Sequence, residues 1–283
     1  MAAQIPHLLE SCLSLPPETS QIVLTGILGA STNWLVLRYL HSLLKPGATN
    51  NRSQYGDESN PKQEDVRVVL VSWMRDYAFW KDGAGRLGLN LGALTTQRKF
   101  SFVDGLSHLF TSAAGRAHPA AQAQGHAYLE SLRMADVAKS LSAAVDQLCA
   151  QGGKIVLVLD QPDVWLATAG TGNGVTSGNL RDLILDLREK VHATILTVSA
   201  DEPLISSQTT SLEKEHAAFG LSLAHEAEAV LSLRLLDTGT AKDVSGVVRI
   251  TRGGGGLGRA IEEREYLYHV GGDGGVKVFE RGQ

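Results

Sequence analysis

One run of seven residues, Lys154–Asp160 (KIVLVLD), constrains most strongly how this chain can fold. Its five middle residues are all apolar, and the run ends in a carboxylate. A strand that is apolar on both faces must be covered on both faces, which is typical of central strands in parallel sheets. Similar short runs lie before and after it, at 21–25, 66–73, 100–103 and 193–199. Helical periodicity between several of them predicts an α/β fold with a mostly parallel central sheet flanked by helices.

Amphipathic stretches mark three of the flanking helices. One begins near Asn33, and another is expected to follow residue 179. The clearest of the three has an apolar stripe at Met134, Val137, Leu141, Val145 and Leu148. After about residue 240 no long helical stretch remains. Short apolar runs with glycine turns between them predict an antiparallel β-rich C-terminal edge, at 229–236, 245–251, 266–270 and 276–281.

Length and composition suit one large domain. We expect residues 1–20 to form an N-terminal extension and residues 21–283 to form a single domain. Polar, Ala-rich or Gly-rich stretches predict mobile loops near 45–65, 111–128, 167–179 and 201–216. Of the 283 residues, 43% are hydrophobic, which excludes global disorder. The net charge of −4 excludes a protein that binds nucleic acid by bulk charge, although a local basic patch stays possible.

The two cysteines, Cys12 and Cys149, are too few for a disulfide framework or a cysteine-based metal cluster. The first residues lack the basic segment of a secretory signal. The longest purely apolar run has five residues, far short of the roughly 20 that a membrane span needs. We therefore expect a soluble intracellular protein without a membrane segment.

A loop between a strand and a helix is where a phosphate site would be sought. Residues 26–33 (GILGASTN) follow the first predicted strand, but they keep only the first glycine of G-x-x-x-x-G-K-[ST]. Ser31, Thr32 and Asn33 stand where that motif has Gly, Lys and a hydroxyl. The loss of the lysine charge and of the Mg²⁺-binding hydroxyl predicts a turn into a capped helix, not a site of ATP hydrolysis. Asp160 has the position of a Walker B carboxylate, but no adjacent Glu follows it, so we expect it to be structural.

Other motifs are less specific. The pattern G-x-G-x-x-G occurs at 83–88 and 253–258, but neither segment stands directly between a strand and a helix as a dinucleotide site requires. The nine histidines show no metal-ligand spacing, so no metal site is predicted. An aromatic cluster could stack on bases, but its position after an apolar strand favours the core or a subunit interface: Trp73, Tyr77, Phe79 and Trp80.

The C-terminal glycine loop carries basic residues. Arg252 and Arg259 flank residues 253–258, and Lys242 is nearby in the sequence. These three side chains could contact an RNA phosphate backbone, or they could be solvated charges at a hairpin. Both interpretations stay open.

Three segments of the sequence resemble those of a known family. They are VSWMRDYAFWKDGAGRLGLNL, FSFVDGL and VLVLDQPDVWLA, and the runs at 102–105 and 159–163 carry most of the likeness. Through these segments the chain resembles the Elongator complex protein 6 family from about residue 21 onward. That family lacks an intact phosphate-binding motif, as this chain does at Ser31, Thr32 and Asn33.

The resemblance implies a RecA-like fold and a non-catalytic subunit without catalytic residues, cofactor or metal. It implies assembly with the fourth and fifth Elongator subunits into a heterohexameric ring that binds tRNA. That ring would associate with the catalytic Elongator subunits, which modify the wobble uridine of tRNA, in the cytoplasm or also the nucleus. By analogy with RecA-like rings, residues 167–179 and 201–216 would face the ligand.

The sequence is also compatible with two other functions. One is a nucleotide-dependent α/β enzyme, an ATPase or a reductase, that acts on its own. The other is an autonomous RNA-binding module that uses the arginines of the glycine loop.

Overall fold

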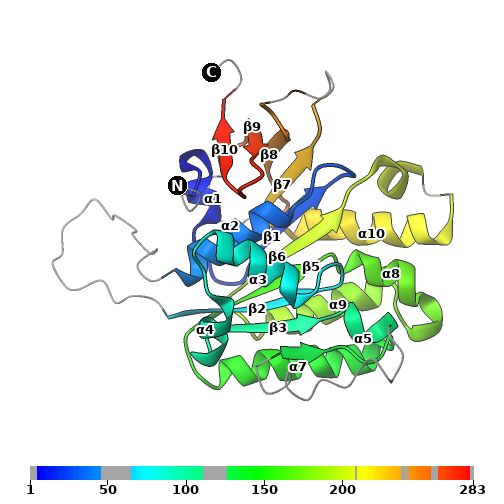
Figure 1. The fold of residues 1–283 in the computed structure, drawn as a ribbon. Coiled ribbons are helices and arrows are strands. Elements are labelled where there is room, and N and C mark those ends of the chain that lie inside the picture. The colour runs from blue at the N-terminus through cyan, green and yellow to red at the C-terminus, as the bar shows by residue number, and fades with distance from the viewer. Residues whose placement is uncertain are drawn as a thin grey trace.

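A ten-stranded sheet runs through the computed structural model, in the order β10-β9-β8-β7-β1-β6-β5-β2-β3-β4 (Figure 1). The structure describes residues 5–45, 65–110, 126–207, 209–236, 241, 243–255 and 261–280. The strands are β1 (Ser20–Gly26), β2 (Val66–Ser72), β3 (Phe100–Asp104), β4 (His126–Tyr128), β5 (Lys154–Asp160), β6 (Ala193–Ser199), β7 (Ala229–Arg234), β8 (Gly246–Arg252), β9 (Arg264–Val270) and β10 (Val276–Phe279).

Helices cover both faces of this sheet, as the sequence predicts for an α/β fold. They are η1 (His7–Leu9), α1 (Glu10–Leu13), α2 (Asn33–Leu44), α3 (Tyr77–Arg86), α4 (Leu91–Thr96), α5 (Ser107–Phe110), α7 (Met134–Cys149), α8 (Asp163–Ala169), η3 (Thr171–Asn173), α9 (Ser177–Arg188), η4 (Pro203–Ser207) and α10 (Ser211–Glu226). Periodicity located α2, α7 and α9 but not α3, α4, α8 or α10. Each of α3 and α4 has a side-chain N-cap, in which Asp76 accepts from the Phe79 N–H and Asn90 from the Ala93 N–H.

The central strand β5 lies between β2 and β6 and is parallel to both. Val156 and Val158 contribute to the apolar cluster on the face of α1 to α4. Ile155, Leu157 and Leu159 contribute to the cluster on the opposite face, with α7 to α10. The alternation of side chains along a strand thus divides this apolar run between two cores, and the prediction of a strand covered on both faces is confirmed.

The segment before β1 belongs to the first of these cores. Leu9 and Leu13 are fully buried in it, and the Tyr39 hydroxyl donates to the Cys12 carbonyl at 2.9 Å. The stretch that we expected as an N-terminal extension is therefore packed onto the sheet through residues 5–19.

The antiparallel C-terminal edge is confirmed for β8, β9 and β10. For β7 the prediction holds on one side only, because β7 pairs antiparallel with β8 but parallel with β1. The reason is α10, which lies between β6 and β7 and carries the chain back across the sheet, so that β7 enters in the same direction as β1.

Two of the predicted loops are partly helical. Residues 167–179 include the end of α8, the short helix η3 and the start of α9, which Thr176 caps by accepting from the Asn179 N–H. Residues 201–216 include η4 and the first residues of α10, where Thr210 and Glu213 form a reciprocal capping box. Residues 210–213 carry the T-x-x-E signature of such a box, which the search for apolar periodicity does not detect. Residues 46–64 and 111–125 lie outside the described residues, whereas β4 follows at His126–Tyr128.

The glycine run at 253–255 is packed tightly against the end of α10. Gly253 N–H donates to Glu228 O and Gly255 N–H to Ala227 O, both at 3.0 Å. A Cβ on Gly253 would overlap the carbonyl oxygen of Ala227. Close backbone approach therefore requires glycine here.

Replacement of Gly253 by Ala should lower the free energy of unfolding by about 1–3 kcal/mol, because the new methyl group has no room beside a carbonyl. Urea denaturation followed by circular dichroism measures this loss. Gly272→Ala is the matched control, because a Cβ there would have no heavy atom within 4 Å. Equal unfolding midpoints for the two variants would contradict the packing argument.

Candidate functional site

The loop after β1 is a tight turn that leads into α2. Ala30 N–H donates to Ile27 O at 2.9 Å, and Gly29 has φ +92°. A Cβ on Gly26 would lie 2.7 Å from Ala30 O, so the chain folds back on itself directly after the strand. This narrow turn replaces the wide loop that wraps around a phosphate in P-loop proteins.

Backbone N–H groups of this loop are already used within the protein. Leu28 N–H donates to Asp201 Oδ1 at 2.8 Å, and Asn33 N–H donates to Ser31 Oγ at 3.2 Å. Thr32 occupies the N-cap position of α2 but makes no side-chain cap hydrogen bond. The Asp201 carboxylate also adds negative charge to a place where a phosphate would need positive charge. The prediction that 26–33 is a turn into a helix is therefore supported by the geometry, although the expected side-chain cap is not formed.

A largely apolar groove of about 500 Å³ lies beside this turn. Its walls include Trp34 of α2, Phe79 of α3 and Tyr268 of β9. Two arginines line it, but Arg38 donates to Gly274 O at 2.9 Å and Arg86 to Gly272 O at 3.4 Å. Because both guanidinium groups hold the β9–β10 hairpin, this groove is a poor cradle for a triphosphate.

Asp160 lies at the carboxyl end of β5 and joins three strands. Ser72 Oγ of β2 donates to its Oδ2 at 2.7 Å, and Thr197 Oγ1 of β6 donates to its Oδ1 at 2.9 Å. Burial raises the pKa of Asp160 above its ordinary value of 3.8, and the bonds from Ser72 and Thr197 oppose that rise. Both carboxylate oxygens thus have protein donors, which favours the structural interpretation of Asp160.

A second buried carboxylate, Asp163, follows at the start of α8. Its Oδ2 accepts from Ser199 N–H at 3.1 Å and lies 3.1 Å from His216 Nε2. The three residues come from α8, the end of β6 and α10, so the contact ties two helices to the sheet. The sequence placed His216 in a loop and gave no reason to pair it with Asp163, because 53 residues separate them.

The other motifs fall into structural positions. Residues 83–88 belong to α3 and the turn after it, and a Cβ on Gly83 would lie 2.8 Å from Leu37 Cδ1 of α2, so this glycine permits close helix packing. Trp73 stacks on Trp165 with ring centroids 6.0 Å apart, and Trp80 is fully buried. These tryptophans are core residues, as the sequence favoured, and are not available to stack on bases.

The predicted RNA-contact residues are described only in part. Arg252 is the exposed last residue of β8, and its N–H donates to Glu263 Oε1 at 3.0 Å. Arg259 and Lys242 lie outside the described residues. Within the ranges that the structure describes, no group of three or more His, Cys, Asp or Glu side chains could hold a metal ion. Over the same ranges, no helix is long and apolar enough to cross a membrane.

The buried carboxyl of Asp160 should influence how stability changes with pH. Its pKa is higher in the folded protein than in the unfolded chain, so its favourable contribution is present below about pH 4 and is lost as the pH rises through the folded value. Asp160→Asn removes the ionisation but also one hydrogen-bond acceptor, at a cost of about 1 kcal/mol. The variant should therefore be less stable than the wild type at low pH, and the difference should shrink as the pH rises.

Urea denaturation at a series of pH values measures that difference. Ser72→Ala is the matched control, because it removes one donor to Asp160 and leaves the carboxyl ionisable. It should keep a pH dependence of the same sign and extend it to higher pH, since the bond from Ser72 opposes the rise of the Asp160 pKa. If the stabilities of Asp160→Asn and the wild type changed in parallel with pH, the pKa of Asp160 would not be raised in the folded protein.

Comparison with solved structures gives the fold family. A KaiC-like protein from the archaeon Pyrococcus horikoshii matches with a TM-score of 0.59 and 15% identity, over 99% of this chain and 98% of that one. At this identity the likeness shows the fold alone. It confirms the expectation of a RecA-like fold.

Comparison at the level of sequence is more specific. The Elongator complex protein 6 of Xenopus laevis is 25% identical over 249 residues, which cover 87% of this chain and 91% of the relative. The Elongator complex protein 6 homolog of Schizosaccharomyces pombe is 24% identical over 201 residues, 67% of this chain and 71% of that protein. A family model described as Elongation complex protein 6 matches residues 62–271. With its RecA-like sheet and its closed turn after β1, this chain belongs to the Elongation complex protein 6 family.

Proposed function

We propose that this chain is a non-catalytic subunit of the Elongator complex. It assembles with the fourth and fifth Elongator subunits into a RecA-like heterohexameric ring. The ring binds tRNA and supports the 5-carboxymethyl-type modification of wobble uridine by the catalytic Elongator subunits, in the cytoplasm. The match of the family model to residues 62–271 carries this proposal.

The turn after β1 supports a role without catalysis. ATP hydrolysis needs donors that meet the phosphates and a hydroxyl that binds Mg²⁺. At this position Leu28 N–H is bonded to Asp201, Thr32 replaces the charged lysine, and Asn33 replaces the metal-binding hydroxyl residue. If the chain were instead an ATPase or a reductase, ATP–Mg²⁺ or NAD(P)H would raise its melting temperature, and we expect neither to do so.

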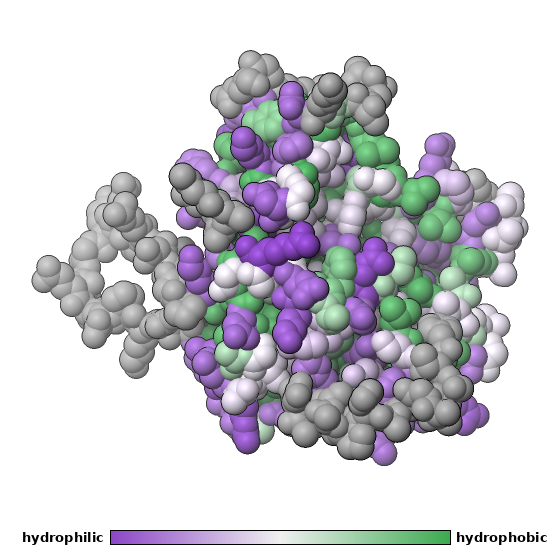
Figure 2. Space-filling view, in the orientation of Figure 1, coloured by the Kyte–Doolittle hydropathy of each residue, from purple (hydrophilic) through white to green (hydrophobic). Residues whose placement is uncertain are grey.

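Exposed leucines near this turn suit contact with partner chains. Leu28 is 87% exposed at the tip of the turn, and Leu235 is 42% exposed just after β7. Leu235 lies against the turn that carries Leu28, because a Cβ on the next residue, Gly29, would lie 3.3 Å from Leu235 Cδ1. Hydrophobic residues are also visible on the surface on the side of α10 and β7 (Figure 2). Exposed apolar surface of this kind is typical of interaction sites.

Co-expression with the fourth and fifth Elongator subunits tests the assembly. The three chains should elute together at equal stoichiometry in size-exclusion chromatography, with the mass of a hexamer. A stable, monodisperse monomer that ignores both subunits would overturn the proposal.

The double substitution of Leu28 and Leu235 by Ser should reduce this co-elution, because it removes apolar area that a partner would bury. The isolated variant should still fold, with a slightly lower urea midpoint, because Leu28 is 87% exposed but Leu235 is only 42% exposed. Leu212→Ser changes another exposed leucine, at the start of α10, and should leave co-elution unchanged. If both variants assemble like the wild type, this pair of leucines is not part of the interface.

The cellular role is tested by the modification itself. Cells that lack the chain should lose 5-carboxymethyl-type wobble uridines, measured by mass spectrometry of tRNA nucleosides, and the wild-type chain should restore them. Asp160→Asn, which changes the Walker-like carboxylate, should also restore them, because the proposal gives Asp160 no catalytic step. A folded Asp160→Asn protein that assembles but cannot restore the modification would point to a catalytic role.

A further inference from the structure

A second groove, of about 630 Å³, lies near the β3–β4 end of the sheet. Residues from α3, α4, β3, β4 and the end of α7 line it. Its polar and charged wall includes Tyr77, Lys81, Arg98, Ser101, His126 and Gln147. Its volume is within the range of about 300–1,000 Å³ that is usual for sites of small ligands.

The charge of this groove is opposite to that of the whole chain. Lys81 and Arg98 are both exposed, and no Asp or Glu is among the described residues that line the groove. The chain as a whole has a net charge of −4. A concave site with two cations and no acid in its described lining attracts anions, even on an acidic protein.

The remaining polar groups of the groove are neutral near pH 7. Burial lowers the pKa of His126, the neighbouring Lys81 lowers it further, and the charge of Asp104 opposes that fall. Burial raises the pKa of the Tyr77 phenol. The ring of His126 packs edge-on against the ring of Tyr77, with ring centroids 3.8 Å apart. Ser101 and Gln147 add neutral hydrogen-bonding groups to the wall. The positive charge therefore comes from Lys81 and Arg98.

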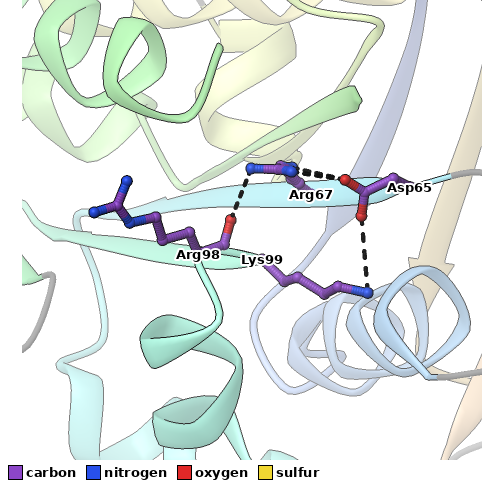
Figure 3. A network of polar contacts seen from close by, with 4 residues as sticks. All are labelled: Asp65, Arg67, Arg98 and Lys99. Carbon is purple, nitrogen blue, oxygen red and sulfur yellow. Dashed lines mark hydrogen bonds and ion pairs between the residues drawn. The ribbon is translucent and has the colours of Figure 1, made fainter. Parts of the chain in front are cut away.

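A network at the amino ends of β2 and β3 fixes the backbone that carries Arg98 (Figure 3). Asp65 accepts from Arg67 Nη2 at 2.7 Å and pairs with Lys99 Nζ at 3.7 Å. Arg67 Nη1 in turn donates to the carbonyl of Arg98 at 3.4 Å. The two neighbouring cations, Arg67 and Lys99, thus both pair with the carboxylate of Asp65.

The side chain of Arg98 extends away from that cluster, as Figure 3 shows. Arg98 has φ +57°, an uncommon left-handed conformation for a residue other than glycine, and its N–H donates to Thr95 O at 2.9 Å. The backbone sets the direction of the Arg98 Cα–Cβ bond, and the Arg98 side chain lines the groove. The network thus holds the backbone from which this cation reaches the groove.

We propose that this groove binds the phosphate backbone of single-stranded nucleic acid through Lys81 and Arg98. A nucleotide fits the volume better than a bare phosphate ion does. The neutral groups of Tyr77 and Gln147 are accessible and can bond to the edges of bases and sugars, whereas Ser101 and His126 are buried in the wall. A duplex would need a broader basic face than two cations provide. The site is on this chain alone and does not depend on the ring.

Fluorescence anisotropy with a labelled oligouridylate of about 12 nucleotides tests the site on the full-length chain. Binding should weaken as salt increases, and each lost phosphate contact should reduce the slope of log K against log salt by about 0.7. Arg98→Asn and Lys81→Gln should each cause that reduction. Asn tolerates the left-handed conformation, so the first variant should fold normally. Lys139→Gln, an exposed lysine of α7 outside the groove, is the matched control and should bind like the wild type.

Three results would overturn the inference. The first is wild-type affinity and salt slope in both groove variants. The second is an equal loss in Lys139→Gln, which would indicate attraction by overall charge. The third is competition by inorganic phosphate or by uridine monophosphate with the same affinity as the oligouridylate, which would indicate a site for a small anion. The groove variants should still elute with the fourth and fifth Elongator subunits, so that a failure of the groove is distinct from a failure of assembly.

Discussion

The hydrogen bonds to one buried carboxylate connect the centre of this protein. Asp160 ends a strand that is apolar on both faces, and it receives hydroxyl donors from β2 on one side and β6 on the other. Thr197 also accepts from the N–H of Gln161 at 2.9 Å, so the same hydroxyl supports the turn after β5. A buried carboxylate without such donors would destabilise the fold, which explains why Ser72 and Thr197 stand opposite Asp160 in register.

The carboxyl edge of the sheet has the form of a nucleotide site, but internal contacts use its groups. In P-loop proteins, free N–H groups after the first strand meet the phosphates. Here Asp201, which follows β6, accepts the N–H of Leu28. Asp163 likewise accepts Ser199 N–H and contacts His216 instead of a ligand. Carboxylates of this chain therefore accept backbone N–H groups at this edge of the sheet, which favours a structural role for it.

The amino ends of β2 and β3 show the opposite electrostatics. Asp65 there is surrounded by Arg67 and Lys99, and Arg98 extends from the same turn into the groove beside α3. A chain with a net charge of −4 can thus present a local positive surface, because sign and strength depend on which side chains the fold brings together.

The sequence by itself determined the fold class and the parallel strands at the centre. Apolar periodicity is local, and runs such as Lys154–Asp160 can be buried in few ways. It also determined that residues 26–33 lack the groups of a phosphate loop. Short helices such as α3, and α10 with its capping box at Thr210, escaped prediction because glycines or polar residues interrupt their apolar pattern. Only the tertiary structure decided that Asp201 meets Leu28, that Asp163 meets His216, and that Lys81 and Arg98 share a groove. These contacts join residues far apart in the chain, and the folding of the sheet alone brings them together.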